Sequence, residues 1–92
     1  MTINAYSVFD KSAGTFSTPF FAPNDEVAKR NFRYSLKKLD DMFVTDLELY
    51  SIGEFDIEDG FFLSGAASRI IDAGENVLSE REIEKKNKEI ER

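Results

Sequence analysis

Two largely apolar, β-forming runs separated by a polar turn predict two antiparallel strands in the first part of the chain. Residues 3–9 and 15–21 are rich in β-forming side chains, and a polar turn separates them. The turn ends in Gly14, which can adopt a positive φ. Pro19 cannot donate a hydrogen bond to a neighbouring strand, so the second strand is expected to lie at a sheet edge or to end early.

A helical repeat of apolar positions begins after Pro23. Asn24 is a suitable N-cap, and Asp25 and Glu26 place negative charge at the positive end of the helix dipole. The helix is expected to end near residues 40–41, where two aspartates would meet the negative end of the dipole. The apolar residues at helical spacing predict its buried stripe: Ala28, Phe32, Leu36 and Leu39.

Three further strands are predicted in the second half of the chain. In chain order they cover residues 47–55, 61–63 and 69–73. Gly53 in the first of them is a candidate for a β-bulge or for a point of close packing. Asp59-Gly60 is a strong hairpin signal between the first and second of these strands. Residues 64–68 are small and predict a loop.

The end of the chain predicts a charged helix. Ser79 and Glu82 have the spacing of a capping box, and Leu78 and Ile83 have the spacing of a hydrophobic staple. A helix is therefore expected from about residue 80 onward. It could dock or fray as a tail. Alternatively, Ile83 and Ile90 at d positions with Asn87 at a could seed a two-stranded coiled coil.

Together the elements follow the order β-β-α-β-β-β-α. They predict an α+β fold in which a small antiparallel sheet of four to five strands packs against one amphipathic helix. Residues 1–78 are expected to form a single domain, and residues 79–92 a charged helix that serves oligomerisation or a partner. Most of the twelve aromatic rings are expected in the core, because buried rings contribute much area in a small domain.

The net charge of −6 is distributed unevenly along the chain. Residues 1–39 have a net charge of +3, residues 40–78 of −9, and residues 79–92 of zero. Proteins that bind nucleic acids are usually basic overall. Any contact with phosphates would therefore have to come from a local patch in the first part of the chain.

The predicted first helix offers such a patch. Its cations could bind phosphates while a nearby ring stacks on a base. The candidate nucleic-acid-binding residues are Lys29, Arg30, Arg33, Lys37 and Lys38, with Tyr34 and Phe20 as stacking candidates. The same pattern also describes the solvated face of an amphipathic helix, whose cations pair weakly with neighbouring acids.

Composition argues against catalysis and against bound cofactors. The chain has no Cys and no His, which removes thiolate sites, the usual general base and a Ser-His triad. Its glycines form no phosphate-binding loop. A run of carboxylates could hold Mg²⁺ or Ca²⁺, although alternation along a strand also describes a solvent-facing surface. That run is Glu54, Asp56, Glu58 and Asp59. We predict no enzyme, no cofactor and no metal site.

Three segments resemble the small nonstructural protein of gokushovirus-type microviruses, which are phages with circular single-stranded DNA. They are Y-S-V-F-D-K at residues 6–11, P-F-F-A-P-N-D at residues 19–25 and D-L-E-L-Y-S-I-G-E-F-D at residues 46–56. The family pattern reads P-F-F-A-x-N-D and F-E-L-Y-x-I-G-E-F-D. The resemblance covers residues 4–57 in order and weakens after Gly60.

The resemblance implies a part in viral DNA replication. Such proteins are labelled DNA-binding and are thought to help shift synthesis from the double-stranded replicative form to single-stranded progeny. The family offers no catalytic residues to carry over. We therefore expect a protein of the host cell cytoplasm that binds single-stranded DNA or the replication complex on it.

The alternative is an acidic adaptor that self-associates and docks on a basic replication or packaging protein. Viral or host replication proteins are expected partners under both hypotheses, and so is a homodimer or higher homo-oligomer. No apolar run approaches the roughly 20 residues that span a bilayer, and the N-terminus lacks a secretion signal, so no membrane partner is expected.

Overall fold

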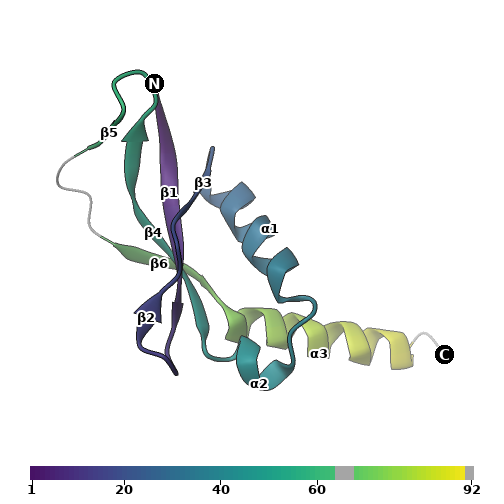
Figure 1. The fold of residues 1–92 in the computed structure, drawn as a ribbon. Helices are drawn as coiled ribbons and strands as arrows, with labels where there is room; N and C mark the ends of the chain where they lie inside the picture. Colours follow the sequence, from purple (N-terminus) through teal and green to yellow (C-terminus); the bar gives the residue numbers. More distant parts are fainter. Residues whose placement is uncertain (64–67, 91–92) are drawn as a thin grey trace.

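The computed structural model describes residues 1–63 and 68–90, with side chains as far as residue 85. A curled, six-stranded antiparallel sheet forms one layer, and the helices lie to one side of it (Figure 1). The predicted α+β class is confirmed. No helix within the described residues combines the length and the apolar character that crossing a bilayer requires.

Strands β1 (Thr2–Asp10) and β4 (Leu47–Asp56) form the centre of the sheet and pair antiparallel along their whole lengths. Both were predicted, over residues 3–9 and 47–55. The register shifts once, because Ala5 pairs with Gly53 while the next residue of β1 pairs with Ser51. Ile52, between Ser51 and Gly53, has no partner on β1, so the predicted bulge at Gly53 is confirmed.

The strand expected over residues 15–21 is divided into β2 (Thr15–Phe16) and β3 (Phe20–Ala22), which both pair with β1. Ser17 takes over the contact between them. Its amide donates to the Val8 carbonyl at 2.8 Å, and its Oγ accepts from the Val8 amide at 3.0 Å. Because Pro19 follows and has no N–H, the strand ends early there, as one of the two expectations had it.

The Asp59-Gly60 hairpin is confirmed between β4 and β5 (Phe61–Phe62). Gly60 has a φ of 76°, and the Asp56 carboxylate accepts hydrogen bonds from two backbone amides of the turn at 2.9 and 3.1 Å. Strand β6 (Arg69–Ala73), also predicted, pairs with the other half of β4. Most of the predicted loop, residues 64–67, lies outside the described residues.

Helix α1 (Asp25–Leu36) begins as predicted, with Asn24 Oδ1 accepting from the Val27 amide at 2.9 Å. It ends at Leu36, earlier than the expected residues 40–41. Leu39 therefore lies outside the helix and is 39% exposed, so its assignment to the buried stripe is wrong. The other three members of that stripe are buried: Ala28, Phe32 and Leu36.

Helix α2 (Asp41–Val44) was not predicted. Asp40 takes its N-cap position, and Asp41 lies in its first turn. The two aspartates that were read as the unfavourable end of one helix thus begin another, where the dipole favours them. Val44 is fully buried and anchors this short helix in the core.

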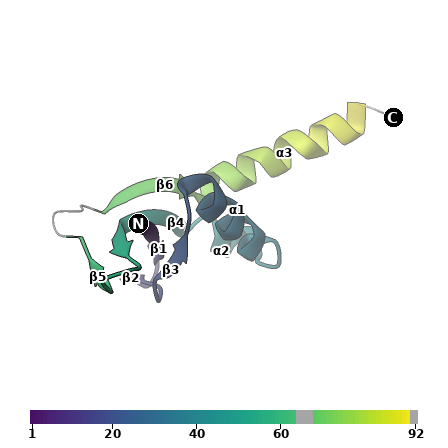
Figure 2. The same ribbon diagram turned by 90° about the horizontal axis from the view of Figure 1, so that it is seen from above.

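Helix α3 (Gly74–Ile90) begins before the predicted start near residue 80 and projects away from the sheet (Figure 2). Ser79 lies inside it, with Oγ donating to the Glu75 carbonyl at 3.1 Å, so the capping box is wrong. Tertiary contact explains the earlier start. A Cβ on Gly74 would lie 1.7 Å from the Val44 carbonyl oxygen, so the chain passes close to α2 here and continues directly from β6.

The first turns of α3 are held by the core. Val77 is buried and Leu78 packs beside it, whereas Ile83 is exposed and makes no staple. The predicted division between residues 78 and 79 falls inside this helix. The coiled-coil hypothesis stays a prediction, because the side chains of Asn87 and Ile90 lie outside the described residues.

The expectation that most of the rings lie in the core is wrong. Of the twelve aromatic residues, all of them described, Tyr6 and Phe32 are buried and six are exposed. Because the helices cover one face of the sheet, rings on the opposite face have no layer above them. They form two clusters there: Phe9, Phe16 and Tyr50, and Phe21, Phe55 and Phe62.

Candidate nucleic-acid interface

An open groove of about 480 Å³ runs along α1. We call it the basic groove. Five of the seven predicted site residues line it, so the structure brings most of them together. The lining residues are Glu26, Lys29, Arg30, Arg33, Tyr34 and Lys37.

Tyr34 is the accessible ring of this groove. It is 73% exposed, and Lys37 Nζ lies 5.3 Å from the centre of its ring, which is a cation–π distance. The ring therefore remains open to a flat partner, with a positive charge beside it. This is the arrangement that stacking on a nucleobase beside a phosphate requires.

Three predicted cations make no ion pair in the part of the chain that the structure describes. They are Arg30, Lys37 and Lys38, and all three are exposed. Lys38 follows the end of α1 and lies outside the lining of the basic groove. Lys29 has a weak pair, since its Nζ lies 3.6 Å from Oε1 of the exposed Glu26.

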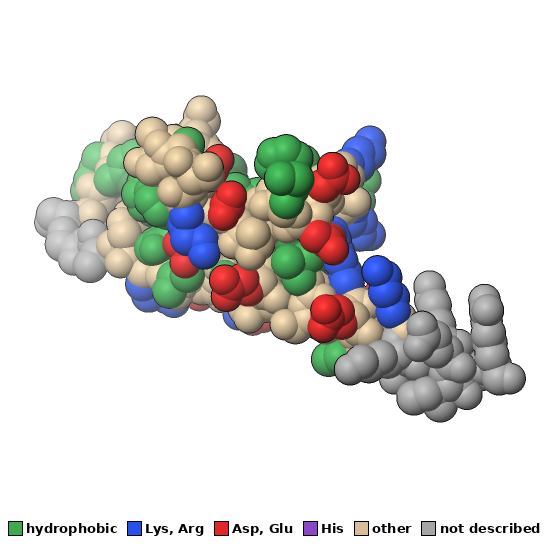
Figure 3. Space-filling model, turned by 90° about the horizontal axis from the view of Figure 1, so that it is seen from below, with side chains coloured by type: hydrophobic (Ala, Val, Ile, Leu, Met, Phe, Trp, Pro, Cys, Tyr) green, Lys and Arg blue, Asp and Glu red, His purple; other side chains and the backbone are tan. Residues whose placement is uncertain are grey.

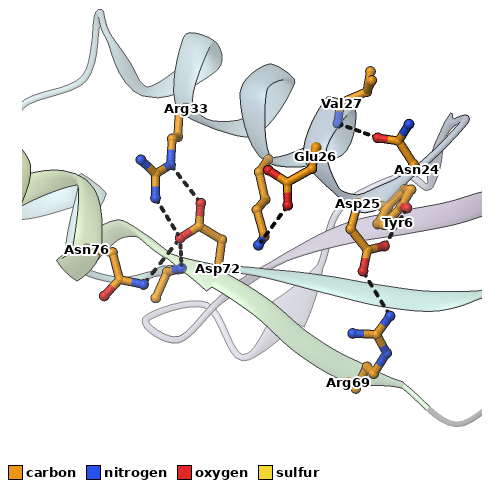
Figure 4. Close-up of polar contacts among 11 residues, drawn as sticks. Tyr6, Asn24, Asp25, Glu26, Val27, Arg33, Arg69, Asp72 and Asn76 are labelled. Atoms are coloured by element: carbon orange, nitrogen blue, oxygen red, sulfur yellow. Dashed lines mark hydrogen bonds and ion pairs between the residues drawn. The ribbon is translucent and has the colours of Figure 1, made fainter.

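Arg33 is held differently, because its guanidinium is occupied by the protein's own carboxylates. Its Nε donates to Asp72 Oδ2 at 2.9 Å (Figure 4). Its Nη1 donates to Glu80 Oε1 at 2.6 Å. The hydrogen bonds that Arg33 donates to Asp72 and Glu80 raise the pKa of Arg33 above its ordinary value. Its charge is balanced within the fold, so we assign Arg33 to the structure rather than to the interface.

Phe20 also lies away from the other candidates. Its ring stacks on Tyr6 at a centroid distance of 5.7 Å and packs against the core. It lines a separate hollow with Asn31 and Ser35, on another side of α1. The structure therefore leaves Tyr34 as the stacking candidate of the basic groove.

The first turn of α1 is fixed to the sheet through Asp25. Tyr6 Oη donates to its Oδ1 at 2.7 Å and Arg69 Nη2 donates to its Oδ2 at 2.9 Å (Figure 4). These two hydrogen bonds lower the pKa of Asp25, and the one from Tyr6 has the larger effect. Burial and the same contact raise the pKa of Tyr6 to about 12. Asp25 and Arg33 together hold both halves of α1, so the basic groove lies on a fixed helix.

The two ring clusters on the open face of the sheet were not predicted. Period-two alternation contained the signal, since the adjacent Phe20 and Phe21 must point to opposite faces. Arg69 is the only Lys or Arg in the six strands, and it pairs with Asp25. No residue of these strands therefore places an unpaired cation beside the rings.

Within the carboxylate run that suggested a cation site, the Asp56 side chain binds the backbone of the β4–β5 turn. The Asp56 carboxylate accepts hydrogen bonds from the backbone amides of Glu58 and Asp59. Both lower the pKa of Asp56, and the one from Asp59 has the larger effect. Among residues 1–63 and 68–90, no group of three or more carboxylates is placed to hold a metal ion.

A protein-family model described as Phage ORF5 protein matches residues 3–76 of the chain. The matched segment runs from β1 to the first turn of α3 and includes the whole basic groove. No curated protein and no solved structure matches the chain.

Proposed function

Because the chain belongs to the Phage ORF5 protein family of bacteriophage proteins, we propose that it is a non-enzymatic protein that binds single-stranded DNA. Its role would be in the synthesis of progeny strands in the host cytoplasm, as its resemblance to the gokushovirus nonstructural proteins implies. The observation that carries this proposal is the basic groove, in which the exposed Tyr34 lies beside Arg30 and Lys37, which form no ion pair within the described residues.

Four cations would meet phosphates: Lys29, Arg30, Lys37 and Lys38. Neutralising three or four phosphates of a single strand predicts that the logarithm of affinity falls with the logarithm of salt concentration with a slope of about −2 to −3. Tyr34 would stack on one base. Stacking on an aromatic side chain contributes roughly 1–3 kcal/mol per base and tolerates any sequence.

The net charge of −6 opposes this binding but does not prevent it. At about 0.1 M salt the Debye length is about 10 Å, so acids on distant elements are largely screened. The local cations then decide whether a phosphate is attracted. The acidic residues restrict the strand to the neighbourhood of α1.

Fluorescence anisotropy with a labelled oligo-dT at two salt concentrations tests the proposal. Arg30→Glu/Lys37→Glu should weaken binding by about tenfold or more, since it replaces two phosphate contacts with repulsion. Tyr34→Ala should weaken binding, whereas Tyr34→Phe should retain it. Arg33 is left unchanged, because its substitution would break its contact with Asp72.

Lys11→Glu/Lys85→Glu is the matched control, because it makes the same change in net charge at exposed positions outside α1, in the turn after β1 and in α3. It should retain most of the affinity. If both double variants lose affinity equally, only overall charge matters and the basic groove is not the site. If the parent protein does not bind oligo-dT, the proposed function is wrong.

A second candidate function is the protein-interaction adaptor, which one observation favours: apolar side chains of α2 are exposed beside acidic ones. Partners that remain bound after nuclease treatment of an infected lysate would support it. Light scattering of the purified chain measures whether it forms the expected homodimer.

A further inference from the structure

The short helix α2 and the segment before it expose adjoining apolar side chains. Met42 is 69% exposed and Phe43 is 55% exposed, and Leu39 lies beside them. A hollow of about 470 Å³ lies between them and the turn after β1. We call it the acidic groove, and its lining residues are Asp10, Ser12, Leu39, Met42, Phe43, Asp46 and Leu47.

These exposed apolar side chains form one continuous surface, because all three line the same hollow. Burying a Met or Phe side chain is worth roughly 1.5–3 kcal/mol, so adjoining exposed ones favour an interaction site. When the molecule of Figure 1 is seen from below, hydrophobic side chains reach the surface between Asp and Glu side chains (Figure 3). Met and Phe are both enriched at protein interfaces.

The acidic groove is formed without a partner, because α3 holds α2 in place. Gly74 passes so close to Val44 that no side chain fits between them. Arg81 Nη1 donates to Asp41 Oδ1 at 2.9 Å, and its Nη2 donates to the Leu36 carbonyl at 3.1 Å. These contacts fix both ends of the segment. A partner would therefore bind without ordering it first, which lowers the entropic cost of association.

The rim of the acidic groove is negatively charged. Asp10 and Asp46 line it, and Asp40 begins α2. Within the described part of the chain, Asp40 and Asp46 have no cationic partner. Lys11, which follows Asp10, has its Nζ 3.7 Å from a carboxylate oxygen of Glu75. Lys38 precedes Leu39 and is exposed at the other end of the rim.

We propose that the acidic groove binds a basic amphipathic segment of another protein. Apolar side chains of that segment would cover Met42 and Phe43, and its Lys or Arg side chains would meet Asp40 and Asp46. The rim repels phosphates, so nucleic acid does not fit. A second copy that met this groove with its own acidic groove is disfavoured, because like charges would then face one another. This inference deepens the adaptor candidate and does not depend on DNA binding.

The probe is a synthetic helical peptide of roughly 18 residues with Leu on one face and Lys on the other, and calorimetry measures its binding. A peptide with Glu in place of Lys is its control. The Lys peptide should bind the parent protein and the Glu peptide should not. Met42→Ser/Phe43→Ser should weaken binding by about tenfold, because it removes the apolar contact. Both side chains are exposed, so the fold is expected to persist, and circular dichroism checks it.

A pair of charge variants separates the acidic groove from general attraction. Asp40→Asn/Asp46→Asn should weaken peptide binding several-fold, whereas Glu58→Gln/Asp59→Asn on the distant β4–β5 turn should not. Equal losses in the two charge variants, or unchanged binding by Met42→Ser/Phe43→Ser, would overturn the proposal. So would light scattering that shows a parental dimer converted to a monomer by Met42→Ser/Phe43→Ser, because a second copy would then fill the groove.

Oligo-dT binding, measured on the same variants, should be unchanged. This readout keeps the two proposals separate. Loss of peptide binding with intact DNA binding concerns only the acidic groove. A parent protein that binds the peptide but no oligo-dT would remove only the proposed DNA function.

Discussion

Arg33 Nε donates a 2.9 Å hydrogen bond to Asp72 Oδ2, and this contact ties α1 to the last strand of the sheet. The Asp72 side chain is only 3% exposed. Its other oxygen accepts from the Ala73 amide at 2.9 Å and from Asn76 Nδ2 at 3.2 Å. A nearly buried carboxylate is thus fully satisfied, and it depends on one guanidinium for its countercharge.

Removing that guanidinium should be costly. Arg33→Met leaves the Asp72 charge buried without a partner, and we expect a loss of about 3 kcal/mol in the free energy of unfolding, measured by urea denaturation. Glu80→Gln is the control, because Glu80 is half exposed and its pair with Arg33 should contribute at most about 1 kcal/mol. Comparable losses in the two variants would contradict this assignment.

Stability should fall in acid because of the same carboxylate. Burial alone would raise the pKa of Asp72, but hydrogen bonds from Arg33, Asn76 and the Ala73 amide outweigh it and lower the pKa. A lowered folded-state pKa stabilises the protein above the unfolded value of about 4, and the stability is lost as pH falls through the folded value. The unfolding free energy of the parent should decrease from pH 5 to pH 2, and Asp72→Asn should flatten this dependence. An unchanged slope would show that other carboxylates dominate.

Substitutions at the N-cap Asn24 and at Ser79, which was predicted as a cap, should differ in their effect on stability. Asn24→Ala removes the hydrogen bond to the Val27 amide and should cost about 1 kcal/mol. Ser79→Ala should cost less than about 0.5 kcal/mol, because Ser79 lies inside α3 and only bonds the preceding turn. Thermal or urea unfolding measures both. A larger loss for Ser79→Ala would restore Ser79 as a cap.

Two glycines are required for different reasons, and substitution separates them. Gly74→Ala places a Cβ against the Val44 carbonyl and should cost about 2 kcal/mol or more. Gly60→Ala meets no atom within 4 Å but forces a positive φ, at about 1 kcal/mol. Asn tolerates positive φ, so Gly60→Asn should recover stability, whereas Gly74→Asn should remain at least as damaging as Gly74→Ala. Recovery at Gly74 would mean that the backbone shifts to make room.

Elements with strong local signals could be predicted from the sequence. Runs of β-forming residues predicted β1 and β4, the Asp59-Gly60 pair predicted the hairpin, and Asn24 predicted the start of α1. The start of α3 could not be found this way. The local cap at Ser79 competes with the contact between Gly74 and Val44, which are distant in sequence, and the tertiary contact prevails.

The basic groove was predictable only in part. Helical spacing placed Arg30, Arg33 and Lys37 near one another, but Asp72 and Glu80 lie 39 and 47 residues beyond Arg33. No local pattern reveals which cation these acids take. Phe20 was misplaced beside the cations for the same reason, since strand pairing decides which face it occupies.

The position of β1 also has a consequence for how the chain folds during its synthesis. β1 can pair early with β2 and β3, which follow it closely in sequence. It can pair with β4 only later, because Asp10 pairs with Leu47 and Thr2 pairs with Asp56. Such long-range pairings slow folding. Until the ribosome has released β4, one edge of the first strand is unpaired and open to neighbouring nascent chains.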